Sequence, residues 1–287
     1  MLAAIRGQSV PRRMPKARRI PSKSPAHIAM LLHPDDPPPF EFFNPQGKAP
    51  LVLFCDHAGR AVPQPLDNLG LPAGAFDQHI AWDIGIADLG RQLSALMDAP
   101  LLLANYSRLV IDCNRHIDDP TSIAQISDGI DIPANRNLSP EARQQRVTEI
   151  FRPYHDALTQ LIAGRLTQDR APVILSLHSF TAVMNGYQRP WQIGILWNED
   201  ARLPVPLMRR FAAEPGVTVG DNEPYSGRDG HGYSMQVHAE GLGLAHALIE
   251  VRQDLIADKA GATTWAQTLY RVCGDVLQDP ALYHRLV

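Results

Sequence analysis

Short, mostly apolar runs that alternate with segments of helical periodicity constrain the fold of this chain more than any other feature. Residues 51–55, 173–177 and 247–251 each have the pattern of a strand that is buried on both faces. Residues 77–97 repeat apolar side chains at helical spacing, and Ser139-Pro140 has the residues of a helix start. Strands that alternate with helices predict an α/β fold, with a mainly parallel or mixed sheet covered on both faces.

The same patterns predict the remaining elements. We expect strands at 51–55, 101–104, 109–113, 173–177, 192–197 and 247–251, and helices at 77–97, 139–165, 204–213 and 264–276. A proline inside a helix removes a hydrogen bond, so Pro153 predicts a break in the second helix. Glycines are frequent in residues 225–233, which predicts a loop there.

The first 48 residues differ in composition from the rest of the chain. They are basic and rich in proline, and we interpret residues 1–48 as a partly disordered leader and linker. Residues 49–287 then form a single domain. Residues 1–34 hold seven of the 27 basic residues and no acid, which leaves 20 basic against 30 acidic residues in the remainder. An acidic body of this kind argues against a nucleic-acid partner.

The cysteines and the hydropathy of the chain bear on its cellular location. The three cysteines, Cys55, Cys113 and Cys273, are widely spaced and form no CxxC pair, so we expect reduced thiols and a cytoplasmic location. No apolar run approaches the roughly 20 residues that a membrane span needs, so we expect no membrane partner. A homodimer is compatible with the sequence, which does not specify the oligomeric state.

Polar residues stand where several predicted strands end, which is where ligands bind in open α/β sheets. His57 follows the first predicted strand, and His178 closes another. Two imidazoles above one sheet edge suit zinc, which in catalytic sites takes three protein ligands and keeps one position open. A lone histidine at such a place is more often a hydrogen-bonded structural residue. No HxxE motif is present, because Arg60 stands three residues after His57, so the carboxylate would come from Asp83, on a predicted helix, or from Asp56.

A second polar cluster surrounds the predicted strand at 109–113. It consists of Arg108, Asp112, Asn114 and Arg115. Guanidinium groups bind carboxylates in a bidentate manner and stay charged, so this cluster is suited to hold an acidic substrate. An ordinary ion-paired strand edge would also account for it.

Glu250 closes the predicted strand that begins at residue 247. It would therefore lie at the same edge of the sheet as the two histidines. A partly desolvated carboxylate beside a metal is a natural general base for an attacking water. Pairing of Glu250 with Arg252 is the structural alternative.

Polar and aromatic side chains alternate with glycines in residues 225–233. This pattern favours a mobile loop over the site, with Arg228 and Tyr233 reaching the substrate. A plain surface turn is the alternative. His238 would line the same pocket.

These motifs together resemble the N-formylglutamate amidohydrolase family over roughly residues 49–280. The order and spacing of the motifs carry the resemblance more than any one of them. They are CDHAG at 55–59, DQHIAWDIG at 77–85, YSRLVIDCNR at 106–115, SLHSF at 176–180 and HAEGLGLAHALIEVRQDLI at 238–256. The cluster at 108–115 is also similar to the substrate-binding pattern of the aspartoacylase and zinc-carboxypeptidase group.

The resemblance implies a three-layer α/β/α sandwich with a mixed, mainly parallel central sheet. It implies that His57 and His178 bind one zinc ion and that Glu250 is the general base. Asn114 and Arg115 match carboxylate and carbonyl binders, with Arg108 beside them. The chain departs from the carboxypeptidase pattern at position 60, and we expect Asp83 as the carboxylate ligand, ahead of His79 and Asp56.

The predicted activity is a zinc-dependent hydrolysis of the amide of a small N-acyl acidic amino acid, such as N-formylglutamate. Arg108 would stabilise the oxyanion together with the metal, and Asp112 would orient Arg115 or a ligand histidine. Two alternatives stay open. One is a related zinc carboxypeptidase or amidase with another substrate, and the other is a catalytically silent member that binds a ligand.

Overall fold

A seven-stranded mixed sheet organises the computed structural model, which describes residues 30–230 and 232–286. The four strands at the centre of the order are mutually parallel, and antiparallel pairings bring in β1 on one side and β9 on the other. The spatial order is β1 (Phe40–Phe43), β3 (Leu101–Ala104), β2 (Leu51–Cys55), β6 (Val173–Phe180), β11 (His246–Arg252), β9 (Ile193–Leu196) and β10 (Val219–Asp221).

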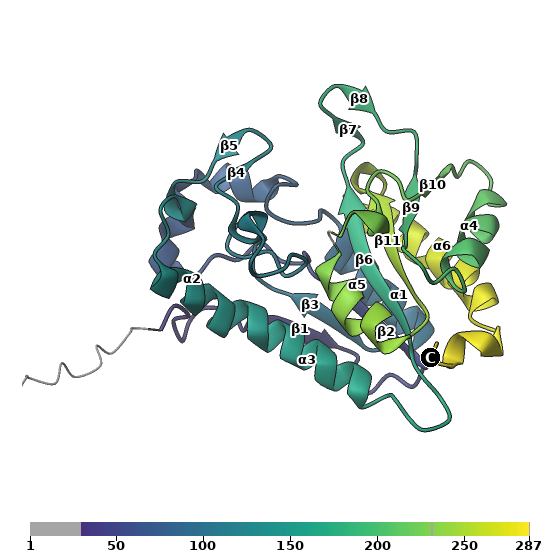
Figure 1. Cartoon of the computed structure of the whole chain (residues 1–287). Helices are drawn as coiled ribbons and strands as arrows, with labels where there is room; N and C mark the ends of the chain where they lie inside the picture. The colour runs from purple at the N-terminus through teal and green to yellow at the C-terminus, as the bar shows by residue number, and fades with distance from the viewer. Residues whose placement is uncertain (1–29, 231, 287) are drawn as a thin grey trace, which may run out of the picture. The chain divides into compact units, whose positions relative to one another are not determined.

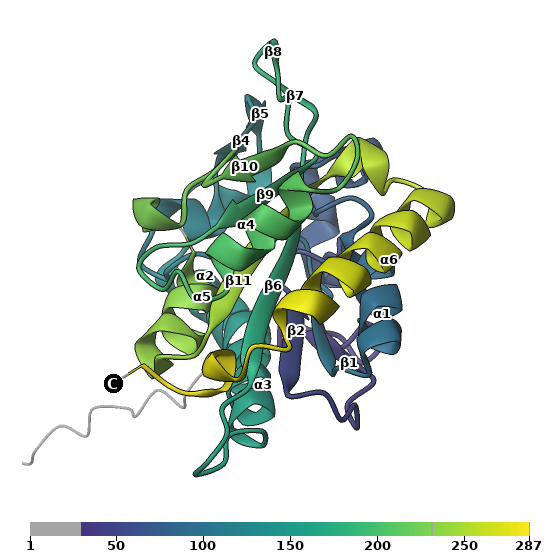
Figure 2. The same cartoon turned by 90° about the vertical axis from the view of Figure 1, so that its right-hand side faces the viewer.

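Helices cover both faces of this sheet, as Figures 1 and 2 show. One face packs against α1 (Ile86–Met97), α4 (Pro204–Ala212) and α6 (Lys259–Val276). The other face packs against α3 (Arg152–Ala163) and the short α5 (Tyr233–His238). The predicted α/β/α sandwich with a mixed, mainly parallel sheet is therefore confirmed.

Alternation along the strands decides which side chains reach which layer. In β2, Leu51 and Leu53 point into the core with α1 and α6, whereas Val52 and Phe54 point toward α3. Because side chains of a strand alternate between faces, each strand is apolar throughout when both faces are covered. This is why the continuous apolar runs predicted the central strands.

The long helix expected at 139–165 is confirmed in its start and in its interruption. Ser139 accepts a hydrogen bond from the Ala142 amide at 3.1 Å and caps α2 (Pro140–Arg146). A π-helical turn follows at Val147–Phe151, directly before α3. Pro153 has no N–H to donate to the preceding turn, which is the physical reason for an interruption here.

One predicted element is wrong in its first part, and a second predicted element is absent. Residues 78–85 of the predicted helix at 77–97 form turns, and α1 begins only at Ile86, because Gly85 has a φ of +81° and a Cβ there would lie 2.0 Å from the Ile256 carbonyl oxygen. Residues 109–113 form turns and no strand. Their carbonyls are paired by side chains instead: Asn135 donates to the Leu109 oxygen and Arg146 to the Val110 oxygen, both at 2.8 Å.

Part of the segment interpreted as leader and linker carries structure. Residues 40–43 form strand β1, which pairs with β3, and the backbone amide of Leu31 donates to the Glu149 carboxylate at 2.9 Å. The first 29 residues of the predicted leader lie outside the described residues. No helix among the residues described has both the length and the apolar character that crossing a bilayer requires.

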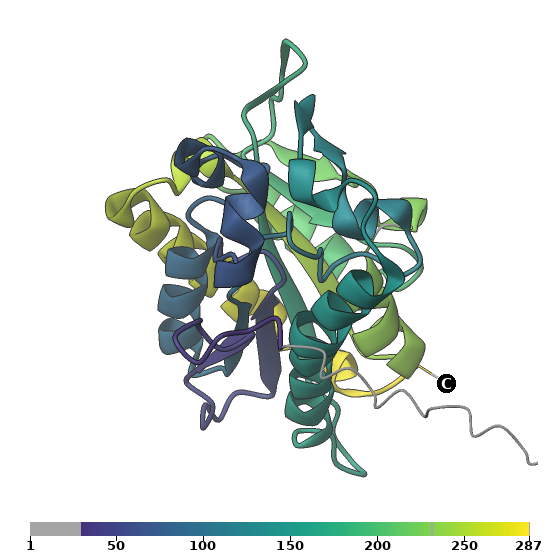
Figure 3. The ribbon, with the colours of Figure 1, turned by 90° about the vertical axis from the view of Figure 1, so that its left-hand side faces the viewer.

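Irregular segments account for the rest of the site's surroundings. Residues 61–82 and 106–151 share a third buried cluster that includes Leu69, Ile80 and Val110, and Figure 3 views the molecule from this side. Two small hairpins extend from the fold: β4 (Ile126–Ser127) with β5 (Ile130–Asp131), and β7 (Val183–Met184) with β8 (Tyr187–Gln188). Both hairpins lie at the upper end of Figure 1.

Candidate metal centre

His178 and Glu250 are neighbours because their strands are neighbours. They are register partners in the parallel pair of β6 and β11. Both continue the alternation that places Ile174 and Leu248 on the α3 face of the sheet. Paired residues of adjacent parallel strands point to the same face, so the imidazole and the carboxylate lie side by side.

Asp83 reaches the same point from a turn. Its amide donates to the His57 carbonyl oxygen at 2.9 Å, which ties the turn to the end of β2. The Ser179 amide donates to its Oδ2 atom at 3.2 Å, which ties the carboxylate to the end of β6. The sequence predicted Asp83 on a helix. In the structure Asp83 precedes the helix, because Gly85 has a left-handed conformation and α1 begins only after it.

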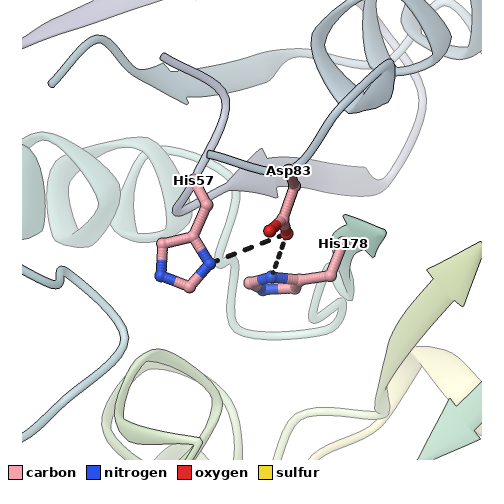
Figure 4. Close-up of side chains that lie close together, drawn as sticks. All are labelled: His57, Asp83 and His178. Atoms are coloured by element: carbon pink, nitrogen blue, oxygen red, sulfur yellow. Dashed lines mark hydrogen bonds and ion pairs between the residues drawn. The ribbon is translucent and has the colours of Figure 1, made fainter. Parts of the chain in front are cut away.

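His57, Asp83 and His178 form a compact buried group, shown in Figure 4. One potential ligand atom of each lies within 4.8 Å of the other two. The Nδ1 atoms of His178 and His57 lie 2.9 and 3.6 Å from Asp83 Oδ2, and the two rings are 5.0 Å apart between centroids. Two nitrogens and one carboxylate oxygen therefore converge on one point.

Other carboxylates hold the far nitrogens of both rings. His57 Nε2 lies 2.7 Å from Asp112 Oδ1, and His178 Nε2 lies 3.3 Å from Asp56 Oδ2. Asp56 in turn accepts hydrogen bonds from the Tyr154 hydroxyl at 3.0 Å. A carboxylate on one ring nitrogen fixes the tautomer and the orientation of the ring, so the Nδ1 atoms are the ones left to face Asp83.

The donor set fits a divalent cation. Two imidazoles and one carboxylate are a ligand set that zinc uses in catalytic sites. Although burial opposes charge on both rings, hydrogen bonds to Asp56 and Asp83 raise the pKa of His178 to about 10, and Asp112 and Asp83 raise the pKa of His57. The buried carboxylates thus favour positive charge at this point, which a bound metal would supply.

Arg108 supplies positive charge to the same group. Its Nη2 atom donates to Asp83 Oδ1 and is hydrogen-bonded to His57 Nδ1. Although burial disfavours the charged carboxylate, the Arg108 guanidinium holds the pKa of Asp83 well below its ordinary value. Arg108 therefore binds one oxygen of the Asp83 carboxylate, and the two histidines face the other.

Glu250 is a buried carboxyl group with an unpaired oxygen. The residue is 6% exposed, and Oε2 has no hydrogen-bond partner among the described residues. Burial raises its pKa to about 7, assisted by the charge of Asp83 and opposed by His178 and Arg108. Arg252 does not pair with it, since that guanidinium bonds to Asp254 at 2.8 Å. A carboxyl that titrates near neutral pH has the properties of a general acid or base.

A cavity of about 320 Å³ opens over these groups. His57, Asp83, His178 and Glu250 line it. The segment after β3 adds Arg108, Asp112, Asn114 and Arg115 to the lining. The structure thus gathers most of the predicted site residues around one space, which is large enough for a small acyl amino acid.

Two of these residues present polar groups to the cavity from a tightly held loop. The backbone amide of Asn114 donates to Asp112 Oδ1 at 2.8 Å. The side-chain Oδ1 of Asn114 accepts from the backbone amide of Ser234 at 3.1 Å. Arg115 has a buried Nη1 atom without a hydrogen-bond partner among the described residues. An unpaired buried guanidinium nitrogen is a group that an anionic ligand would satisfy.

Three predicted substrate contacts lie away from the cavity lining. Arg228 stacks over the Trp197 ring at 4.9 Å, and Tyr233 packs against Phe151. His238 Nε2 lies 2.9 Å from His155 Nδ1, in a buried pair of stacked rings. The cause in each case is a neighbour from a distant segment, which the local sequence does not reveal.

The two residues considered as alternatives to Asp83 for the third ligand also lie outside the group. His79 lines the cavity but stands 3.4 Å from Asp128. Asp56 contacts the far nitrogen of His178, Nε2, and not the nitrogen that faces Asp83. The predicted loop at 225–233 does line the cavity, through Tyr225 and its neighbours and not through the two residues expected. Tyr225 stood in the right segment, whereas nothing in the sequence around Thr181 indicated its place in the lining.

A family model and a curated relative both associate this chain with N-formylglutamate hydrolysis. A family model described as N-formylglutamate amidohydrolase matches residues 49–257. An N-formylglutamate deformylase of Pseudomonas putida is 26% identical over 254 residues, which are 82% of this chain and 91% of that protein.

Solved structures share the fold. A gene product of Agrobacterium tumefaciens is 33% identical with a TM-score of 0.83, over 86% of this chain and 98% of that one. N-formylglutamate amidohydrolase from Ralstonia eutropha is 24% identical with a TM-score of 0.63, over 84% of this chain and 97% of that one. Because the family model covers most of the chain and the motifs that it spans line the cavity, this protein belongs to the N-formylglutamate amidohydrolase family.

Proposed function

We propose that this protein is a zinc-dependent hydrolase that cleaves the amide bond of a small N-acyl acidic amino acid such as N-formylglutamate. The observation that supports this most is the convergence of His57, Asp83 and His178 beside the unpaired carboxyl of Glu250, in one cavity. Membership of the N-formylglutamate amidohydrolase family supports the choice of substrate.

In this proposal His57, Asp83 and His178 hold the zinc ion. Bound there, the ion would polarise the acyl oxygen and make a water molecule more acidic. Asp112 and Asp56 keep the two rings in place through their far nitrogens. Asp112 thus acts on a ligand histidine, which is one of the two roles expected for it.

Glu250 moves the proton in the proposed reaction. Its free Oε2 atom accepts a proton from the attacking water as the oxygen bonds to the acyl carbon. The same carboxyl then donates that proton to the amide nitrogen, which leaves as an amine. A pKa near neutrality suits both transfers, because the group gives up and takes the proton at similar cost.

The arginines bind the negative charges of substrate and transition state. Arg108 lines the cavity beside the metal-binding group and donates to the acyl oxygen as charge develops on it. Asn114 and Arg115 bind one substrate carboxylate, which positions the amide over the reacting groups. The substrate is a small molecule, and the cytoplasmic location stays a prediction.

A substrate panel tests this proposal directly. Formate release from N-formylglutamate would be compared with hydrolysis of N-acetylglutamate, a dipeptide with a C-terminal glutamate and a cell-wall peptide. Turnover of the formyl substrate at the highest kcat/KM supports the proposed function. Preference for the dipeptide or for the cell-wall peptide would favour a carboxypeptidase or an amidase instead, and no turnover of any substrate would favour a binding protein.

The pH dependence of kcat/KM provides a prediction about Glu250. A general base must be deprotonated, so kcat/KM should fall about tenfold per pH unit as the pH drops below its pKa. Burial raises that pKa from 4.5 to about 7, and a bound cation would lower it again, so the inflection should lie between these two values. Steady-state rates across this pH range measure it. The prediction is wrong if Glu250→Gln keeps the same inflection.

Replacing Arg115 by alanine should mainly weaken substrate binding. Loss of a guanidinium bound to a carboxylate should raise KM for N-formylglutamate roughly 10- to 100-fold, with a smaller change in kcat. Arg271→Ala is the matched control, since that side chain is exposed and pairs with Glu214 on the surface. An equal loss on N-formyl amides without a carboxylate would contradict the assigned role.

A further inference from the structure

Behind two residues of the cavity lining, Thr181 and Tyr225, lies a buried arginine, Arg189, that the proposed mechanism does not use. Arg115 belongs to the segment after β3, whereas Arg189 precedes β9 and Tyr225 follows β10. In the sheet these elements lie on opposite sides of β6 and β11, the strands that carry His178 and Glu250. Arg115 thus lines the cavity itself, and Arg189 stands behind the lining residue Tyr225 as a second cation.

Arg189 is a cation without an anion. The residue is 8% exposed, and it forms no ion pair with any acid of the described residues. Its Nη1 atom donates to the carbonyl oxygen of Thr181 at 3.2 Å and to the Thr181 hydroxyl at 3.0 Å. A buried charge without a partner of opposite sign is costly, so an anionic ligand near Arg189 would offset that cost.

Tyr225 connects Arg189 to the cavity, because it is hydrogen-bonded to that guanidinium and lines the cavity. Its hydroxyl oxygen accepts from both Nη1 and Nη2 of Arg189 at 3.3 Å, and the guanidinium lies 5.0 Å over the Tyr225 ring. A phenol that accepts from a guanidinium still has its own proton to donate. Within the described part of the chain that proton has no acceptor. Tyr225 and Thr181 both line the cavity, so their hydroxyl groups are placed to donate to a ligand.

We propose that Tyr225 and Thr181, backed by Arg189, are the residues that bind the second carboxylate of the substrate. This inference rests on the proposed function for the identity of the substrate. Arg115 and Asn114 bind one carboxylate, and the hydroxyl groups of Tyr225 and Thr181 bind the other. Two hydroxyl donors polarised by one guanidinium are charge-assisted hydrogen-bond donors, and a carboxylate gains most from such groups.

Glutarate provides a binding test that needs no turnover. It has the two carboxylates of glutamate and no amide, and glutaramate replaces one carboxylate by a neutral group. Calorimetry on the full chain should show tighter binding of glutarate than of glutaramate. Tyr225→Phe removes only the donor, so it should weaken glutarate about tenfold and leave glutaramate nearly unchanged. Arg189→Gln should have the same effect. Should that variant fail to unfold cooperatively, Tyr225→Phe decides alone.

Kinetics provide a second readout with a matched control. Tyr225→Phe should raise KM for N-formylglutamate about tenfold, with kcat within about twofold and little change for N-formylglutamine. Tyr187→Phe makes the same substitution on an exposed tyrosine of β8 and should change neither constant.

Two results would overturn the inference. One is unchanged glutarate affinity in Tyr225→Phe, and the other is a fall in kcat on both substrates at constant KM, which would place the phenol on the reacting oxygen. The proposed function can fail separately. A wild-type protein that binds glutarate through Tyr225 but does not hydrolyse N-formylglutamate would refute the proposed activity. The assignment of Tyr225 and Thr181 as carboxylate-binding residues would still hold.

Discussion

Replacing Glu250 by glutamine is expected to lower kcat by about 10²–10⁴, the range that a general base contributes. Glutamine has nearly the same shape and cannot accept the proton of the attacking water. The variant should still bind one zinc ion per chain, because Glu250 is not one of the three converging ligands. Initial rates with saturating N-formylglutamate, together with metal analysis, check both statements.

The stability of the same variant separates a catalytic role from a structural one. Burial raises the pKa of Glu250 in the folded protein from 4.5 to about 7, so the folded state loses stability as the pH rises between these values, and a neutral glutamine does not lose it. The metal-free Glu250→Gln protein should therefore melt at or above the wild-type temperature at pH 8. Glu199→Gln, at an exposed position, is the control for the substitution itself. A kcat close to wild type would mean that another group accepts the proton.

Removal of the metal is the second change with a large expected effect. Dialysis against a chelator should reduce turnover roughly 10³-fold or more, because the acyl oxygen and the water lose their activating cation. Addition of zinc should restore it. The melting temperature should rise on zinc addition as well, since a ligand that binds only the folded state stabilises it. Full activity in a preparation shown to be metal-free would refute the proposed mechanism.

Asp83→Ala tests which carboxylate holds the ion. Loss of this ligand should reduce both the zinc content and the turnover to nearly those of the chelated protein. Asp88→Ala is the matched control, because Asp88 is exposed on the first turn of α1, only five positions along the chain. If zinc content stays at one ion per chain in Asp83→Ala, the third ligand is a different residue and the assignment of the metal centre must change.

The central strands and the residues at their ends were predictable because their signals are local. Both faces of β2, β6 and β11 are covered, so these strands are apolar throughout. Strands β1 and β10 gave no such signal. Residues of β1 are only partly buried and lie between prolines, and β10 has three residues. A strand at the edge of a sheet makes fewer contacts and therefore constrains its sequence less.

The helix predicted at 77–97 shows how a periodic pattern can mislead. Ile80 and Ala81 are buried, as a helix face would be, but they pack into the cluster formed with residues 106–151. The backbone there turns repeatedly, and Gly85 has a conformation that no helix interior contains. The burial of Ile80 was therefore predicted correctly and its secondary structure was not, whereas the helix itself was predicted correctly from Ile86 to Met97.

The sequence by itself determined the layered α/β architecture and placed His57, His178 and Glu250 at one edge of the sheet, because parallel strands bring their ends together whatever the loops do. Only the tertiary structure decided that Asp83 approaches both rings, that Tyr225 and not Arg228 lines the cavity, and that Arg189 lies buried behind it. Those contacts join segments far apart in the chain, and loop paths fixed by many small packing interactions bring them together. No local pattern of residues records such a path.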